Sequence, residues 1–367
     1  MDNLKAIVVD DTIVYRKIVS DVLKEIPGVE VVAAAFNGKI ALSKIATLKP
    51  DFITLDIEMP EVNGIEVLQA LKDQEDAPVV IMLSTLTHEG GEMTMKALEL
   101  GAFDFVPKPN QGTMAENLEK VKKAITPIIN TLKRQRGGRL QPGLRSAVRT
   151  TTKPLLKKPS TDTSPATSPK RVIRKSKSEI IGIGISTGGP NALTKMIPML
   201  PAELKVPVLI VQHMPPMFTA SLAKSLSSKS KLDVREAADG DTLEPGKILI
   251  APGGKQMKIV AGADGITRKI KITDDPPENS CKPSVDYLFR SIAQHYVGRS
   301  TGVIMTGMGS DGTKGLVQMK NNGSTVIAQN EETCTVYGMP KGPVESGTAD
   351  IVVPLENIAR EIVKTVT

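Results

Sequence analysis

The sequence predicts two α/β domains joined by a polar linker. Each half of the chain alternates apolar runs of strand length with helical patterns, and a basic stretch rich in Pro, Ser and Thr separates the halves. Such alternation is typical of mostly parallel sheets covered by helices. With 367 residues, 40% of them hydrophobic, the chain is long enough for two cores. We expect a flavodoxin-like (βα)5 domain at 1–125, a linker at 126–177 and a doubly wound domain at 178–367.

Five apolar runs in the first half predict five strands: LKAIVVD, VEVVAAA, DFITLD, PVVIMLS and DFVPK. Ligands of parallel sheets bind at the carboxyl ends of the strands. Polar side chains fall at these ends, namely Asp10, Asp11, Asp56, Ser84 and Lys108. We therefore expect these five side chains to meet at one edge of the sheet.

Three carboxylates at one edge repel one another unless a cation neutralises them, and Mg²⁺ prefers such oxygen ligands. With the metal bound, Asp56 could attack a phosphoryl group, while Lys108 and the Ser84 hydroxyl receive the incoming charge. The simpler interpretation, that each aspartate caps the following helix, explains any one of these residues but not all five. A cis peptide between Lys108 and Pro109 could aim the lysine.

Four stretches of this half closely resemble the receiver domain of two-component response regulators: DD at 10–11, DIEMPEVNG at 56–64, LST at 83–85 and PKP at 107–109. The resemblance implies that a histidine kinase phosphorylates Asp56. It implies a Mg²⁺ site formed by three carboxylates and one backbone carbonyl: Asp10, Asp11, Asp56 and Glu58. Ser84 and Lys108 would then contact the phosphoryl group, and the surface around Phe105 would repack.

The linker carries most of the positive charge. The whole chain has a net charge of +7, yet Asp162 is the single acid between Lys133 and Lys177. A composition such as KKPSTDTSPATSPKR cannot bury enough apolar surface to fold. Its charge either keeps the linker soluble or attracts it to an acidic partner or membrane face.

The second half predicts too much sheet for a DNA-binding helix-turn-helix module, with strands such as EIIGIGI, VPVLIVQ, KILIAP, TGVIMT and STVIAQ. Aromatic residues make up 3% of the chain, which disfavours a stacking platform for single-stranded nucleic acid. We therefore expect no nucleic-acid partner. No apolar run reaches 18 residues, so we expect neither a signal peptide nor a membrane span. Cys281 and Cys334 lack metal-ligand spacing and predict reduced thiols in a cytoplasmic protein.

The stretch GIGISTGGPNAL at 182–193 could cradle a phosphate, present a nucleophile or form a plain strand-to-helix corner. The sixth residue from Gly182 is Thr187, which breaks the dinucleotide fingerprint, and the Gly-Lys-Ser/Thr ending of a Walker loop is missing. What fits is G-x-S-x-G, with Ser186 exposed at a sharp turn. A serine nucleophile needs a base and an orienting carboxylate. His213 and Asp311 each follow a predicted strand, as Ser186 does, whereas His88 lies in the first domain and His295 in a helical pattern.

Five motifs of the second half closely resemble, in order and spacing, the C-terminal domain of chemotaxis protein-glutamate methylesterases (CheB): GISTGGP, QHMPPMFT, CKPSVDYLF, TGMGSDG and YGMP. The resemblance implies a Ser186, His213 and Asp311 triad with no esterase cofactor, and an oxyanion hole formed by the amides of Thr187 and Met308. It implies hydrolysis of glutamate γ-methyl esters on chemoreceptors, deamidation of receptor glutamines, and a receiver that restrains the esterase until Asp56 is phosphorylated. Such a protein would be cytoplasmic and would associate with membrane-bound receptor arrays.

Two alternatives stay open at this point. The chain could be a phosphorylation-dependent interaction module that has lost catalysis, although the three triad residues argue against this. It could also be a nucleotide-binding regulator, which a nucleotide would stabilise against heat.

Overall fold

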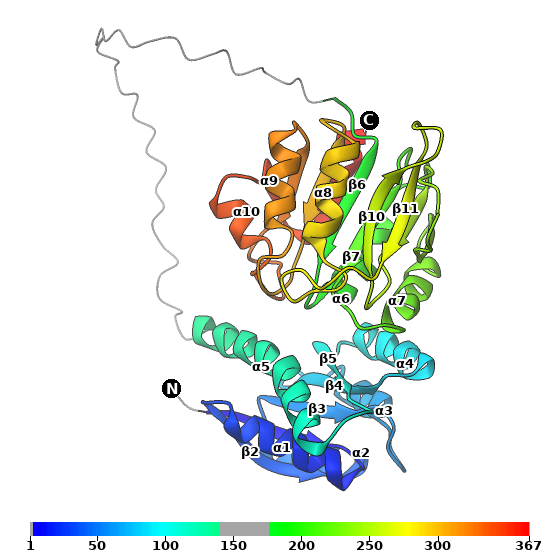
Figure 1. Ribbon diagram of the computed structural model, residues 1–367. Coiled ribbons are helices and arrows are strands. Elements are labelled where there is room, and N and C mark those ends of the chain that lie inside the picture. The colour runs from blue at the N-terminus through cyan, green and yellow to red at the C-terminus, as the bar shows by residue number, and fades with distance from the viewer. Residues whose placement is uncertain (1–2, 140–175, 367) are drawn as a thin grey trace, which may run out of the picture.

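The computed structural model describes residues 3–139 and 176–366, so most of the predicted linker lies outside the described residues. Each half of the chain forms a parallel sheet covered by helices (Figure 1). The predicted fold class is therefore confirmed. None of the helices in the described ranges is long and apolar enough to cross a membrane.

The first domain has five parallel strands in the order β2-β1-β3-β4-β5. The strands are β1 (Leu4–Val9), β2 (Val29–Ala35), β3 (Phe52–Asp56), β4 (Val79–Thr85) and β5 (Asp104–Lys108). The helices are α1 (Ile13–Glu25), α2 (Gly38–Leu48), α3 (Gly64–Leu71), α4 (His88–Glu99) and α5 (Met114–Arg139). Buried residues of α1 and α5 cover one face of the sheet, and those of α2, α3 and α4 cover the other. All five predicted strands are present.

Helix α5 continues beyond residue 125, where the sequence pattern places the end of the first domain. Its residues Ile128, Ile129 and Leu132 are buried in the same cluster as α1. Thr113 and Glu116 exchange hydrogen bonds at its start, which satisfies amides that the helix leaves unpaired. The helix thus carries the core of the first domain into the stretch assigned to the linker.

The second domain has seven parallel strands in the order β14-β13-β12-β6-β7-β9-β8. They are β6 (Ile180–Ile185), β7 (Val208–Gln212), β8 (Asp233–Glu236), β9 (Lys247–Ile250), β12 (Ser300–Ile304), β13 (Thr325–Gln329) and β14 (Ile351–Val353). An antiparallel hairpin consists of β10 (Gln256–Ala261) and β11 (Arg268–Thr273).

Helices cover both faces of this sheet. One face carries α6 (Gly189–Met196), α7 (Phe218–Ser227) and α11 (Leu355–Val366), and the other carries α8 (Val285–His295) and α9 (Thr313–Asn321) with the hairpin. The short helix α10 (Lys341–Glu345) and a 3₁₀ turn (Ile197–Met199) complete the domain. Strands β6, β7 and β12 are buried along their whole length, as expected for the centre of a parallel sheet.

The strand order reverses between β6 and β12. Strands β7, β9 and β8 lie in that order on one side of β6, and β13 and β14 lie on the far side of β12. In open α/β sheets such a switch point creates a crevice at the carboxyl ends of the strands, where ligands bind. Ser186 follows β6, and the loop containing Asp311 follows β12, so both lie at this crevice.

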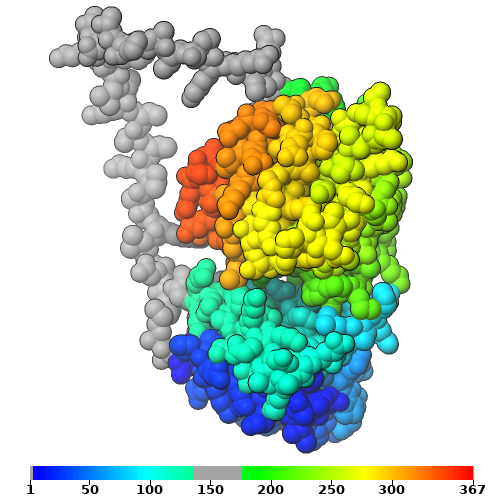
Figure 2. All heavy atoms as spheres, viewed as in Figure 1, coloured from blue at the N-terminus to red at the C-terminus, as the bar shows by residue number. Residues whose placement is uncertain are grey.

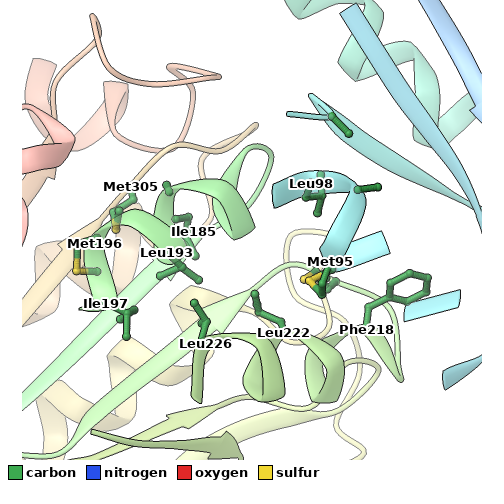
Figure 3. Packing of buried hydrophobic residues seen from close by; sticks show 14 of the residues in the cluster. Met95, Leu98, Ile185, Leu193, Met196, Ile197, Phe218, Leu222, Leu226 and Met305 are labelled. Carbon is green, nitrogen blue, oxygen red and sulfur yellow. The ribbon is translucent and has the colours of Figure 1, made fainter. Parts of the chain in front are cut away.

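The first domain packs against the second through α4, which contacts α6 and α7 (Figures 1 and 3). Met95 and Leu98 of α4 belong to the same buried cluster as Leu222 of α7. Two ion pairs accompany this apolar contact: Glu92–Lys224 and Glu99–Lys229. In the space-filling view the two domains form one continuous surface on this side (Figure 2).

Candidate active site

Ser186 lies in a tight turn between β6 and α6. Its amide donates to the Thr306 carbonyl at 3.0 Å, which ties the turn to the end of β12. Gly188 has φ 73°, and a side chain there would collide with Thr335, so the turn requires glycine. Gly307 has the same role on the facing loop, since a Cβ there would lie 2.8 Å from the Ser186 Cβ. These glycines bring the loop after β12 close to a half-buried Ser186.

His213 and Asp311 are in direct contact. His213 Nε2 lies 2.8 Å from Asp311 Oδ2, and the histidine side chain is 14% exposed. The backbone places His213 beside the serine turn, because its amide donates to the Ile185 carbonyl. The three predicted triad residues therefore lie at the same edge of the sheet.

Asp311 is held by the amino-terminal end of α8. Its Oδ2 accepts from the Val285 amide at 2.7 Å, and its Oδ1 accepts from the Asp286 amide at 3.1 Å. Ser284 Oγ also donates to Oδ1, at 2.9 Å. Burial by itself raises the pKa of Asp311, but the hydrogen bonds from His213 and these amides outweigh it and lower the pKa to about 2. The carboxylate is thus ionised and fixed in position.

The second ring nitrogen of His213 faces a thiol. With Nε2 occupied by Asp311, Nδ1 is the nitrogen left to act on Ser186, and Cys281 Sγ lies 3.7 Å from it. In the described part of the chain, Nδ1 bonds to this thiol and not to Ser186. Burial by itself lowers the pKa of His213, but its bonds to Asp311 and Cys281 raise the pKa to about 9. This arrangement keeps a proton on the histidine at neutral pH.

The first domain carries an acidic cluster at the carboxyl ends of β1 and β3. Ligand oxygens of Asp10, Asp11 and Asp56 all lie within 4.8 Å of one another. Lys108 Nζ lies 2.7 Å from Asp10 Oδ2 and 2.6 Å from Asp56 Oδ2. Burial raises the pKa of Asp56 to about 6 despite the lowering effect of Lys108. One lysine cannot neutralise three carboxylates, so the cluster fits a divalent cation with oxygen ligands.

Ser84 is bonded to α4. Its Oγ accepts from Thr94 Oγ1 at 2.6 Å and donates to the Gly90 carbonyl at 3.2 Å. Phe105 stacks on Phe218, the first residue of α7, so the segment before Lys108 also reaches the second domain. The possible cis peptide at Lys108–Pro109 is wrong: in the described residues the cis bond is Lys282–Pro283. The ion pairs with Asp10 and Asp56 orient the Lys108 side chain without a cis peptide.

The comparisons with known proteins agree with both sites. A family model described as CheB methylesterase matches residues 181–362, and one described as response regulator receiver domain matches residues 6–119. A protein-glutamate methylesterase/protein-glutamine glutaminase of Desulfotalea psychrophila is 57% identical over 371 residues, which cover 100% of this chain and 99% of that protein. The chain belongs to the CheB methylesterase family. The predicted family, a methylesterase that carries a receiver domain, is thereby confirmed.

Other members of the CheB family are also similar. A protein of the same name from Bacillus subtilis is 42% identical, over 99% of this chain and 98% of its own. The crystal structure of the Thermotoga maritima CheB methylesterase catalytic domain is 42% identical, with a TM-score of 0.50, and covers 52% of this chain and 99% of that one. The second domain thus matches a catalytic domain that was solved by itself.

Sequence reasoning missed part of this CheB-family site. The thiol of Cys281 contacts His213, and the side chains of Asn279 and Ser284 donate hydrogen bonds to Asp311. The spacing of the cysteines had predicted no role for Cys281. Cys281 lies 68 positions from His213, and the loop between β11 and α8 has no periodicity that points inward. The roles of Thr187 and Met308 as oxyanion donors, and of the Glu58 carbonyl as a metal ligand, stay predictions. Met308 is 47% exposed and precedes Gly309, which has φ 85°.

Proposed function

We propose that the chain is a phosphorylation-regulated serine esterase that hydrolyses glutamate γ-methyl esters on chemoreceptors and deamidates receptor glutamines. The observation that carries this proposal is the His213–Asp311 pair at the crevice beside Ser186. A buried carboxylate that orients a histidine next to a serine at a strand-end turn supports acyl transfer. The names of the relatives supply the substrate class.

In the proposed reaction Ser186 Oγ attacks the ester carbonyl while His213 Nδ1 takes its proton. The amides of Thr187 and Met308 donate to the oxyanion of the tetrahedral intermediate. His213 then protonates the departing methanol, which leaves an acyl-enzyme on Ser186. Water, deprotonated by the same histidine, releases free glutamate. With a glutamine side chain, the leaving group is ammonia.

His213 must change its contacts before this reaction starts. Its Nδ1 faces Cys281, and its pKa of about 9 keeps it protonated at neutral pH. Catalytic hydrogen bonds are often long in a resting enzyme and tighten when substrate binds. We infer that the structure represents a resting state with the base not yet engaged on Ser186.

The receiver would restrain the esterase through the α4–α7 contact. Met217 and Phe218 follow the strand that positions His213, and Gly91 of α4 lies against Ser221 of α7. Lys120 and Pro127 of α5 line a cavity of about 570 Å³ together with Met308. The receiver therefore covers one side of the proposed crevice, where a receptor substrate would have to dock.

Phosphorylation of Asp56 would loosen this contact. Asp10, Asp11 and Asp56 would hold Mg²⁺, which neutralises the charge of the carboxylates and of the incoming phosphoryl group. To contact the phosphoryl group, Ser84 must give up its bonds to Thr94 and the Gly90 carbonyl. Because both partners belong to α4, the helix that packs on α7 loses two of its anchors. The phosphodonor would be a chemotaxis histidine kinase, and the protein would act in the cytoplasm at receptor arrays.

The test is product release from receptors. Full-length protein is incubated with methylated receptor membranes, with and without a small phosphodonor and Mg²⁺, and methanol and ammonia are measured. We expect both products, and faster release with the phosphodonor in the wild type but not in Asp56→Asn. No methanol under any condition would refute the esterase, whereas equal release with and without phosphodonor would refute only the regulation.

A further inference from the structure

The loop before α8 makes a tight turn at the rim of the site. Glu278 and Cys281 exchange backbone hydrogen bonds of 3.1 and 2.8 Å, and the two residues between them have positive φ, 51° for Asn279 and 62° for Ser280. This is the pattern of a type I′ turn, which favours Asn-Gly over Asn-Ser. A serine in the left-handed conformation destabilises the fold, so it persists only where surrounding contacts hold the backbone in that conformation.

An arginine of α8 anchors this turn, and one side chain of the turn points toward the buried acids of the site. Arg290 of α8 binds both carboxylate oxygens of Glu278, which anchors the first residue of the turn. Asn279 lies exposed at the surface, yet its amide points at two buried acids. Asn279 Nδ2 donates to Asp311 Oδ1 and to Asp286 Oδ2, each at 3.0 Å.

The two acids are almost fully buried, with Asp286 1% and Asp311 2% exposed. Asp286 is bonded on its other oxygen to the Gly315 amide, at 2.7 Å. Burial raises the pKa of Asp286, and the charge of Asp311 raises it further, which is the signature of two acids that repel each other. One amide group has two N–H donors, so Asn279 can satisfy one oxygen of each acid at the same time.

We propose that Asn279 is a positioning residue of the esterase: its amide bridges Asp286 and Asp311 and so holds Asp311 Oδ2 on His213. The inference rests on the triad of the proposed function. Ser284 and three backbone amides hold Asp311 as well, so loss of Asn279 leaves the carboxylate bound but displaces it. Without Asn279, the side chains of Asp286 and Asp311 also lose the amide group that binds both of them.

Loss of the bridge should affect turnover and its pH dependence together. A hydrogen bond to a charged group contributes enough that its removal corresponds to about a 10- to 100-fold change in rate. The charged or titratable groups that face the His213–Asp311 pair are Cys281, Asp286, Glu278 and Arg290. Displacement of Asp311 weakens the hydrogen bond that raises the pKa of His213, so His213 loses its proton at lower pH and the acidic limb of kcat/KM moves downward.

The experiment compares full-length, phosphorylated wild type with Asn279→Ala and Asn279→Asp, using methanol release across pH. We expect Asn279→Ala to lower kcat about 10- to 100-fold, with KM changed less than about threefold and the acidic limb at lower pH. Asn279→Asp adds a third acid and should lower kcat further. Both variants lose a donor to two buried acids, which lowers their stability, so each is assayed at a temperature at which circular dichroism shows it folded.

Asn322→Ala is the matched control. Asn322 also donates its amide to α8, to the Ala293 carbonyl at 2.9 Å, but it does not contact the triad. If Asn322→Ala reproduces the loss, or if Asn279→Ala retains wild-type kcat and acidic limb, Asn279 does not position Asp311. Ser186→Ala is assayed beside them: turnover in that variant would refute the triad itself, and the positioning role with it.

Discussion

Phe105 of the receiver stacks on Phe218 of the esterase, with ring centroids 4.8 Å apart and ring planes inclined by 20°. Phe105 lies three residues before Lys108, which binds Asp56, and Phe218 lies five residues after His213. The stack thus joins β5, the strand that carries Lys108, to the loop that carries the proposed base. A rearrangement around Lys108 would therefore act on the esterase through the contact between the two rings.

Phe105→Ala should weaken the closed arrangement of the two domains. An aromatic pair contributes about 0.5–1.5 kcal/mol beyond its buried area, so we expect basal esterase activity without phosphodonor to rise about 2- to 10-fold. The measurement is methanol release by the unphosphorylated protein. An unchanged basal rate, with the fold intact by circular dichroism, would mean that the stack does not restrain the esterase.

The ion pair between Glu99 and Lys229 offers a charge-swap test of the same interface. Exposed ion pairs contribute about 0.2–1 kcal/mol, so Glu99→Lys should raise basal activity about 2- to 5-fold at low salt. Adding Lys229→Glu restores opposite charges and should return the basal rate to the wild-type value. If the double variant is as active as the single one, the contact has no role in restraint.

Asp56→Asn should stabilise the receiver in the absence of Mg²⁺, because it removes a buried charge beside Asp10. Burial raises the pKa of Asp56 from 3.8 to about 6, so the folded wild type binds a proton that the unfolded chain lacks between these values. Wild-type stability therefore falls as pH rises from 3.8 to about 6. The difference in unfolding temperature between variant and wild type should be largest above pH 6 and shrink below it, which thermal unfolding would show.

Mg²⁺ supplies the control for this prediction. The cation should raise the unfolding temperature of the wild type at pH 7.5 and have less effect on Asp56→Asn, which lacks one carboxylate. Equal stabilisation of both proteins would argue against Asp56 as a ligand.

Cys281→Ala should shift the pH dependence of the esterase. The thiol helps to raise the pKa of His213 to about 9, and His213 must lose its proton before it can act as a base. Activity should therefore rise with pH toward about 9 in the wild type, and the acidic limb should move to lower pH in Cys281→Ala. Cys334→Ala is the control, since no bond joins that thiol to the triad in the described residues. Identical profiles of wild type and Cys281→Ala would contradict the assigned cause.

The sequence predicted the strands and strand-end residues because they follow local rules. Apolar runs of strand length mark buried parallel strands, and polar residues just after them mark the edge where ligands bind. This reasoning placed Ser186, His213 and Asp311 together, although the first and last lie 125 positions apart. The same rule brought Asp10, Asp56 and Lys108 to one edge of the receiver.

The contacts around the triad could not be predicted in this way. Asn279 and Cys281 lie in a loop whose path depends on the type I′ turn and on Arg290, not on a periodic pattern. The extension of α5 beyond residue 125 was missed because its many Lys and Arg residues resemble the linker in sequence, while Ile128, Ile129 and Leu132 lie in the core of the first domain. The domain contact through Phe105 and Phe218 depends on two surfaces that no local pattern relates.

The most direct test of the account measures methanol released from methylated receptors by phosphorylated wild type, Ser186→Ala, His213→Ala and His295→Gln. Loss of a nucleophile or its base lowers kcat by about 10⁴- to 10⁶-fold in such triads, and we expect this of Ser186→Ala and His213→Ala. His295 lies at the end of α8, away from the triad contacts, so His295→Gln should stay within a few-fold of wild type. If Ser186→Ala retained more than about a tenth of wild-type turnover while folded, the proposed nucleophile would be wrong.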